Sequence, residues 1–284
     1  MILVTAATGQ VGRELVPVLR SRGLAFRALV RGAALEGGVE CVRGDFRDST
    51  SLVAAMAGVE RMYLACAPTP DQAELEMRAI DAAARNGVRH VVKLSAYDAH
   101  DANPSDFRRW NGVAERHLYN SGLAWTILRP TAFNQSLDPR AVVERGVLCS
   151  PQGAATTPFV DTRDIANVAA AVLGGTGHDG RIYDLTGPEA FTQPALAALI
   201  AEVFAAPVAC RPVSDAEALR GLLERGMDEG FARSMIVHWQ SYRARPATLV
   251  SGWIEILTGQ SPRTLRAYLE ECRGSAPDGA PAAS

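Results

Sequence analysis

The stretch ILVTAATGQVG, residues 2–12, decides the fold of this chain. Its apolar first residues are typical of a strand, its small residues of a turn, and the residues that follow carry the packing face of a helix. A strand that opens into a helix through such a turn aims free backbone N–H groups at one point, where a phosphate binds well. Gly9 lets a pyrophosphate approach the backbone, and Gly12 lets the helix lie close to the strand. The stretch therefore predicts a βαβ unit that binds a dinucleotide.

Ala6 is the irregular residue of this turn. The usual spacing of dinucleotide-binding turns asks for a glycine at this position. With an ordinary negative φ the methyl group of Ala6 costs little, whereas a positive φ would require the pyrophosphate loop to shift. The sequence leaves open how Ala6 affects cofactor affinity.

Arg31 follows the second predicted strand and bears on which dinucleotide is bound. An acidic residue at this distance from the glycines would hold a ribose 2′-hydroxyl, whereas an arginine accommodates a 2′-phosphate. The guanidinium group matches a phosphate in geometry and keeps its charge. The sequence therefore favours NADP(H) over NAD(H), with a solvated loop arginine as the alternative.

Apolar strand-like runs alternate with helical patterns through the first half of the chain, which predicts an α/β fold with a Rossmann-type doubly wound parallel sheet. The predicted strands are residues 1–5, 25–30, 39–43, 60–66, 89–95, 124–129 and 181–185. The predicted helices are residues 10–21, 49–57, 70–86, 104–121, 165–173 and 192–204. Residues 158–164 read as a strand that runs into a helix N-terminus.

This pattern also predicts the domain organisation. Residues 1–135 form the NADP-binding core, and residues 136–272 complete that core and add a smaller, mostly helical substrate-binding part. A lid is expected at about 207–245, after a short strand at 207–213. Residues 273–284 are rich in Ala, Pro and Gly, and we expect a disordered tail there.

Composition excludes several classes of protein. A net charge of −2 gives no basic footprint for nucleic acid, and no apolar run approaches the roughly twenty residues that cross a bilayer. The first residues enter a strand at once and read as no secretion signal. The five cysteines lack metal-ligand spacing. We expect a cytoplasmic monomer or homodimer with reduced thiols, no metal, no membrane contact and no nucleic-acid partner.

Several segments together resemble the NmrA-like group of atypical short-chain dehydrogenases/reductases, over roughly residues 1–272. The opening T-G-A-T-G-x-x-G of that group matches residues 5–12 except at Ala6. Its G-D-x-x-D turn is similar to Gly44-Asp45 with Asp48, and residues 121–130 are similar to its strand leading to the nicotinamide region. The group includes quinone reductases, dye reductases, cofactor-sensing regulators and ketoreductases of aromatic polyketide pathways.

Together, the motif and the resemblance imply NADP(H) as cofactor and indicate where it binds. The expected cofactor-binding residues are Thr5, Ala7, Thr8, Gly9, Gln10, Val11, Gly12, Arg31, Asp45, Phe46, Ala65, Cys66, Ala67, Ser95 and Phe133. The expected substrate-binding residues are Phe133, Asn134, Trp239 and Tyr242. For the aromatic residues near position 239, which share a helical face, plain core packing is the alternative.

The catalytic groups are less well defined. The best-known members of the wider superfamily use a tyrosine with a lysine four residues later. That pair cannot exist here, because Lys93 is the only lysine and Arg89 stands four residues before it. Ser95 and Tyr97 are candidate hydrogen-bond donors to a substrate carbonyl. We expect Lys93 in a structural ion pair. Glu115 and His117 are expected on a solvated helix surface, with the alternative that both reach the pocket.

The leading interpretation is an NADPH-dependent reductase of a carbonyl or quinone group on an aromatic polycyclic small molecule, as in the ketoreductases of antibiotic-type polyketides. Such substrates stabilise negative charge themselves, so the enzyme needs to supply mainly proximity and orientation. One alternative is a non-catalytic NADP(H) sensor that regulates a partner protein. A third interpretation is an isomerase or epimerase that uses NADP transiently.

Overall fold

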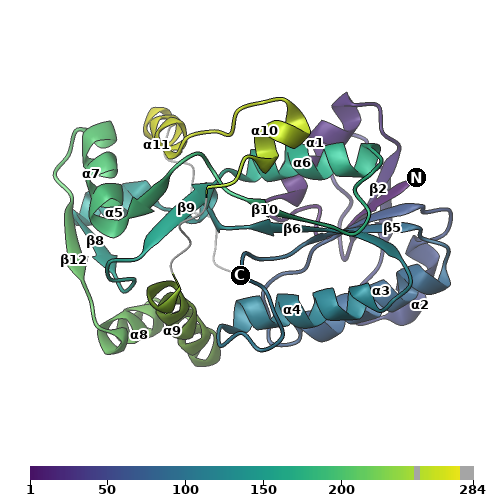
Figure 1. Cartoon of the computed structure of the whole chain (residues 1–284), viewed down its shortest axis with the longest axis horizontal. Coiled ribbons are helices and arrows are strands. Elements are labelled where there is room, and N and C mark those ends of the chain that lie inside the picture. The colour runs from purple at the N-terminus through teal and green to yellow at the C-terminus, as the bar shows by residue number, and fades with distance from the viewer. Residues whose placement is uncertain (246–249, 276–284) are drawn as a thin grey trace. The chain divides into compact units, whose positions relative to one another are not determined.

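The structure is a computed structural model that describes residues 1–245 and 250–275 (Figure 1). The chain divides into two compact units. The first comprises residues 1–131, 162–186 and 251–261. The second contains the described residues of 132–161, 187–250 and 262–284.

The first unit is built on a parallel sheet of seven strands. In spatial order they are β10 (Arg181–Leu185), β6 (Ala124–Pro130), β5 (His90–Leu94), β4 (Arg61–Leu64), β1 (Ile2–Val4), β2 (Phe26–Val30) and β3 (Cys41–Arg43). Strand β1 pairs with β2 on one side and with β4 on the other. The strand order reverses at this point, and open α/β sheets bind ligands at the carboxyl ends of the strands there.

Helices cover both faces of this sheet (Figure 1). One face carries α1 (Gly12–Ser21), α6 (Thr162–Gly174) and α10 (Trp253–Thr258), and the other carries α2 (Ser49–Ala55), α3 (Gln72–Arg85) and α4 (Asp106–Tyr119). Strand residues such as Leu64 and Val91 and helix residues such as Ile80 form the core between sheet and helices. Both faces are covered, so most residues of these parallel strands are apolar, although every strand except β1 also carries a charged or ionisable residue.

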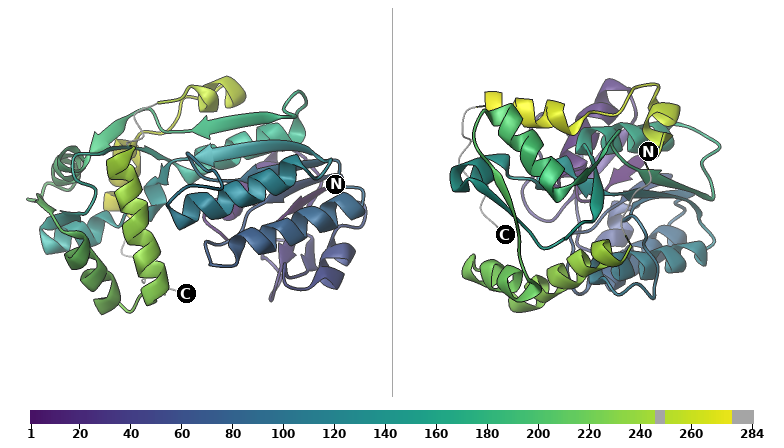
Figure 2. Two further views of the ribbon diagram at one scale, coloured as in Figure 1. Left: turned by 60° about the horizontal axis from the view of Figure 1, so that its bottom comes forward. Right: turned by 60° about the vertical axis from the view of Figure 1, so that its left-hand side comes forward.

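The second unit has two small sheets. The order in one is β11 (Ala190–Thr192), β9 (Thr156–Val160) and β7 (Ala132–Phe133), and the other pairs β12 (Ala209–Pro212) with β8 (Val147–Ser150). Its helices are α5 (Pro139–Arg145), α7 (Gln193–Phe204), α8 (Asp215–Glu224), α9 (Glu229–Ala244) and α11 (Leu265–Gly274), with a 3₁₀ turn at Asn134–Ser136. Helices α8 and α9 pack together as a hairpin, seen from two further sides in Figure 2.

The predicted doubly wound sheet is confirmed, and each predicted strand overlaps an observed one. The first unit takes most of the predicted segment 1–135 and also recruits α6, β10 and α10 from later in the chain. The expected tail was placed too early, because Arg273 and Gly274 still belong to α11. Residues 276–284 lie outside the described part of the chain. No described helix is both long enough and apolar enough to span a membrane.

Candidate active site

Thr5 fixes the start of the glycine turn. Its wholly buried hydroxyl lies 3.0 Å from the carbonyl oxygens of Tyr63 and Ala65 and accepts a hydrogen bond from the Ala65 N–H at 2.9 Å. The Thr5 N–H donates to the Tyr63 carbonyl at 3.1 Å. Thr5 therefore ties the carboxyl end of β1 to that of β4, and its hydroxyl is engaged by the backbone.

The turn itself keeps the close packing that its glycines predict. Ala6 has a φ of +47°, and its carbonyl accepts from the Gly9 N–H at 2.9 Å. A Cβ atom at Gly12 would lie 2.1 Å from the Ala6 oxygen, and one at Gly9 would lie 3.2 Å from it. Ala6 thus adopts the backbone conformation that glycine prefers, and the strain is located at this residue.

The first turn of α1 presents unpaired donors. Its N-cap, Val11, provides no side-chain cap. Among residues 1–245 and 250–275, the backbone N–H groups of Gln10, Val11 and Gly12 have no acceptor. Free N–H groups at the positive end of a helix bind phosphate oxygens. The pyrophosphate of a nicotinamide dinucleotide, the cofactor that this fold implies, fits this loop.

The ends of β2 and β3 carry the residues expected at the adenosine half. Arg31 is exposed directly after β2 and has no carboxylate partner within the described residues. Asp45 follows β3 and accepts from the Arg47 N–H at 2.8 Å. Asp48 caps α2 by accepting from the N–H groups of its first turn. Phe46 packs against the edge of the core. Among the expected residues, Arg31 is therefore the cation that no described carboxylate engages.

The loop after β4 adds Ala65, Cys66 and Ala67. Burial, and secondly the Glu76 carboxylate, raises the pKa of the Cys66 thiol to about 11. The thiol therefore stays protonated and uncharged at neutral pH. This loop presents small, neutral side chains at the same end of the sheet as the glycine turn.

Ser95 follows β5 and belongs to a buried network. Its hydroxyl donates to Glu115 Oε1 at 2.5 Å, and Arg129 Nε donates to the same oxygen at 3.0 Å. Glu115 Oε2 accepts from Arg129 Nη2 and from the Tyr119 hydroxyl. Burial, and then the Glu115 carboxylate, raises the pKa of Tyr119. The proton of Ser95 is thus committed to Glu115, and the Ser95 oxygen retains only its capacity to accept.

Glu115 corrects the sequence prediction. It was expected on a solvated surface, yet it is only 1% exposed because it pairs with Arg129 and Ser95 from β6 and the end of β5. His117 is partly exposed and contacts Asp81 at 2.7 Å. The alternative that Glu115 reaches the pocket is the one that holds, and Asn111, Glu115 and Leu118 share one buried helix face. Sequence reasoning missed Arg129 as a member of the network.

Tyr97 and Lys93 have opposite surroundings. Tyr97 is half-buried, and its hydroxyl has no partner in the described part of the chain. Lys93 is wholly buried, and its Nζ donates to Glu76 Oε2 at 2.7 Å and to Asn111 Oδ1 at 2.8 Å. The expected structural ion pair of Lys93 is confirmed, so its ammonium group is not free to assist a tyrosine.

The expected substrate-binding residues all lie in the second unit. Phe133 ends β7, and Asn134 is buried, with its Nδ2 3.5 Å from Asp161 Oδ2. Trp239 packs in the small apolar cluster between α8 and α9, as the core-packing alternative predicts. Tyr242 is buried next to His238, with ring centroids 4.9 Å apart. No three described His, Cys, Asp or Glu side chains are arranged to hold a metal ion.

Comparisons with known proteins agree with this geometry. A 35% identical relative is the (4-alkanoyl-5-oxo-2,5-dihydrofuran-3-yl)methyl phosphate reductase of Streptomyces griseus, covering 95% of this chain and 97% of that protein. The NAD(P)H azoreductase of Xenophilus azovorans is 31% identical, and the match covers 97% of this chain and 98% of that protein. Among solved structures, an NADPH-dependent quinone oxidoreductase from Escherichia coli, complexed with NADPH, superposes with a TM-score of 0.89 at 26% identity, covering 96% of this chain and 99% of that one.

A family model described as NAD(P)H-binding matches residues 6–175. These residues include the glycine turn, Arg31 and the Ser95 network, and they make up more than half of the chain. The fold and the free donors of α1 are those that such a family requires. The chain belongs to the NAD(P)H-binding family.

Proposed function

We propose that this protein is an NADPH-dependent reductase of a carbonyl or quinone group on an aromatic polycyclic small molecule. Its relatives with established names include a quinone oxidoreductase, an azoreductase and a reductase of an unsaturated lactone phosphate. Their common chemistry is reduction of a conjugated, electron-poor group. The observation that carries the proposal is the glycine turn, whose N–H groups lack acceptors among the described residues, together with Arg31, which follows the neighbouring parallel strand β2 and has no carboxylate partner among them.

The side chains define what the protein would contribute. NADPH supplies the hydride when it is bound. Ser95 Oγ would orient a bound group only by accepting a hydrogen bond from it, because Ser95 donates its own proton to Glu115. The Tyr97 hydroxyl is the free O–H group near the end of β5, so it would donate to the substrate oxygen. A substrate that delocalises negative charge needs little more, because positioning alone is worth roughly 7–11 kcal/mol.

NADPH oxidation tests the proposal. Purified protein is assayed against a panel of quinones and polycyclic aromatic ketones, with NADH in parallel. Turnover with NADPH preferred supports the reductase. Tight NADPH binding without turnover across the panel favours the alternative of a non-catalytic NADP(H) sensor. Net NADPH consumption argues against an isomerase or epimerase.

Arg31→Ala tests the cofactor preference. We expect its KM for NADPH to rise by about 10- to 100-fold, because a charge-assisted hydrogen bond to the 2′-phosphate is worth about 1.5–3 kcal/mol. The KM for NADH should change less than threefold. Arg22→Ala is the matched control, since Arg22 is an exposed arginine at the other end of α1. An equal loss with both cofactors would contradict the assignment of Arg31.

A further inference from the structure

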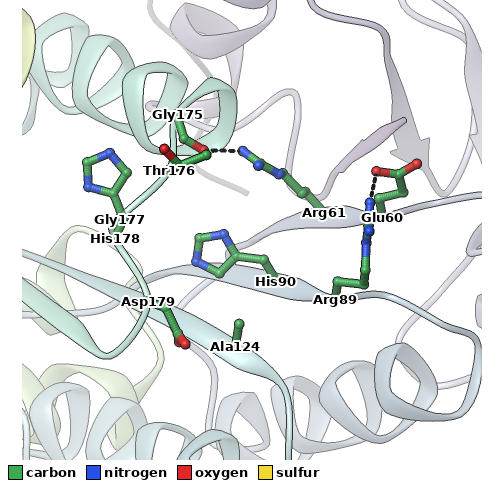
Figure 3. Close-up of a pocket in the computed structure, with 10 residues that line it drawn as sticks. All are labelled: Glu60, Arg61, Arg89, His90, Ala124, Gly175, Thr176, Gly177, His178 and Asp179. Carbon is green, nitrogen blue, oxygen red and sulfur yellow. Dashed lines mark hydrogen bonds and ion pairs between the residues drawn. The ribbon is translucent and has the colours of Figure 1, made fainter.

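A concave site lies at the amino-terminal edge of the sheet in the first unit. It is a hollow of about 290 Å³ at the starts of β4, β5 and β6 and the loop after α6 (Figure 3). The glycine turn lies at the carboxyl ends of the same parallel sheet, so this hollow is separate from the candidate active site.

Strand register creates the hollow. Arg61 pairs with His90, and His90 pairs with Ala124, so the three side chains form one row across neighbouring strands. Arg61 and His90 are long, whereas Ala124 has only a methyl group and leaves space beside the imidazole. The loop of residues 175–179 borders this space, and Figure 3 shows His90 between Arg61 and His178.

Unused hydrogen-bond donors surround the space. Arg61 Nη1 donates to the carbonyls of Leu173 and Gly175 and so places a positive charge at the negative end of α6. The Nε and Nη2 atoms of Arg61 have no acceptor among the described residues. The backbone N–H groups of residues 176–179 likewise have no acceptor in that part of the chain. The donors come from a strand and a loop, so they approach the space from different directions.

His90 adds a group that changes with protonation. The Thr126 hydroxyl donates to the His178 carbonyl at 2.6 Å, so it accepts from His90 Nε2, which lies 2.9 Å away. His90 Nδ1 is then the free nitrogen. It accepts a hydrogen bond when the ring is neutral and donates one when the ring is protonated. Burial, and then Arg61, lowers the pKa of His90 and also that of His178.

The carboxylates at the hollow are each engaged through one oxygen. Glu60 forms an ion pair with Arg89, and Asp179 Oδ1 accepts from the Trp125 N–H at 3.1 Å. Glu60 Oε1 and Asp179 Oδ2 have no partner among the described residues, so a bound oxyanion would lie near these two acceptors as well as near the donors and imidazole nitrogens. Donors that are not coplanar suit a tetrahedral oxyanion better than a flat carboxylate.

We propose that this hollow binds a phosphate group, either as free phosphate or as the phosphate of a small phosphomonoester. Its oxygens would accept from Arg61 and from the loop of residues 176–179, and His90 Nδ1 would share a proton with the phosphate. The binding would join the starts of three strands to the end of α6. This phosphate binding would use no residue of the proposed cofactor site.

Imidazole NMR of the NADPH-saturated protein tests the proposal. The chain has only five histidines, so His90 and His178 can be assigned by substitution. Saturating NADPH keeps phosphate away from the glycine turn and from Arg31. Sodium phosphate and glycerol 1-phosphate are titrated separately, with sodium chloride at matched ionic strength. We expect saturable shifts of His90 and His178 at millimolar phosphate, with both titration midpoints moved to higher pH.

Variants localise the binding. Ala124→Leu fills the hollow, and His90→Gln removes the titrating nitrogen. Each should weaken phosphate binding by at least about tenfold, as expected for one lost charge-assisted contact. Arg78→Ala is the matched control, because Arg78 is an exposed arginine on α3 that does not line the hollow, and it should leave the shifts unchanged. NADPH binding verifies that each variant is folded. If Ala124→Leu does not fold, His90→Gln alone tests the phosphate site.

Each outcome of the titrations either supports or overturns the phosphate site. Tighter binding of glycerol 1-phosphate than of phosphate supports a phosphomonoester site, and equal affinity supports a free-phosphate site. The proposal is overturned if neither gives a saturable shift, if chloride gives the same shift, or if His90→Gln binds as wild type does. These results do not depend on turnover, so failure of the proposed reductase activity would be seen separately.

Discussion

At the scale of single residues, Ala6 carries the strain of the glycine turn. Its φ of +47° is a region where an L-residue with a Cβ is disfavoured by about 1 kcal/mol or more. The turn nevertheless keeps the Gly9–Ala6 hydrogen bond and the close approach of Gly12. Of the two alternatives that the sequence leaves open, Ala6 therefore follows the one with a positive φ, and the chain accepts local strain there.

Ala6→Gly should stabilise the protein. Relief of the strain exceeds the extra entropy of glycine in the unfolded chain, so we expect a gain of about 0.5–1 kcal/mol in the free energy of unfolding. Urea unfolding measures it. Ala7→Gly is the matched control: Ala7 is buried and has no positive φ, so glycine there should cost about 1 kcal/mol. Equal losses in both variants would refute the strain at Ala6.

At the scale of secondary-structure elements, Glu115 fastens α4 to the sheet. It joins the helix to Arg129 in β6 and to Ser95 after β5. Glu115→Gln would leave the Arg129 guanidinium without its counter-charge. We expect a loss of about 3 kcal/mol, as for other broken buried pairs.

The control for that variant is Glu74→Gln on the neighbouring helix α3. Glu74 pairs with Arg78 one turn away, and its side chain is 64% exposed. Exposed pairs of this kind contribute roughly 0.3–0.5 kcal/mol. Chemical denaturation compares the two variants. Similar losses would show that burial of Glu115 adds nothing to its ion pair.

The same elements show what could be predicted from the sequence. Strands of the large sheet were predictable because they are apolar runs separated by helical patterns. The burial of Glu115 was not, because its partners lie 14 and 20 residues away on separate strands. In the second unit, β8 and β11 were missed since they are three or four residues long and pair with strands distant in sequence. The glycine turn was predictable because backbone geometry alone specifies it.

At the scale of the whole molecule, global stability should depend on the hollow at the amino-terminal edge of the sheet. Its two histidines, His90 and His178, have pKa values lowered by burial and by Arg61, against a weaker opposing effect of Asp179 on His90. A histidine in an unfolded chain has a pKa of about 6.5. As pH falls below that value the unfolded chain takes up protons before the folded protein does, so the free energy of unfolding decreases.

We therefore expect the protein to be less stable at pH 5.5 than at pH 7.5, and the His90→Gln, His178→Gln double variant to lose less stability over this interval. Carboxylates whose pKa is lowered by arginine partners, such as Asp215 beside Arg243, act only at lower pH. Glu76, whose pKa is raised by burial, opposes the trend but contributes equally to both proteins. Urea unfolding in phosphate-free buffer at both pH values measures the difference. An identical pH dependence in the two proteins would show that these imidazoles do not couple protonation to folding.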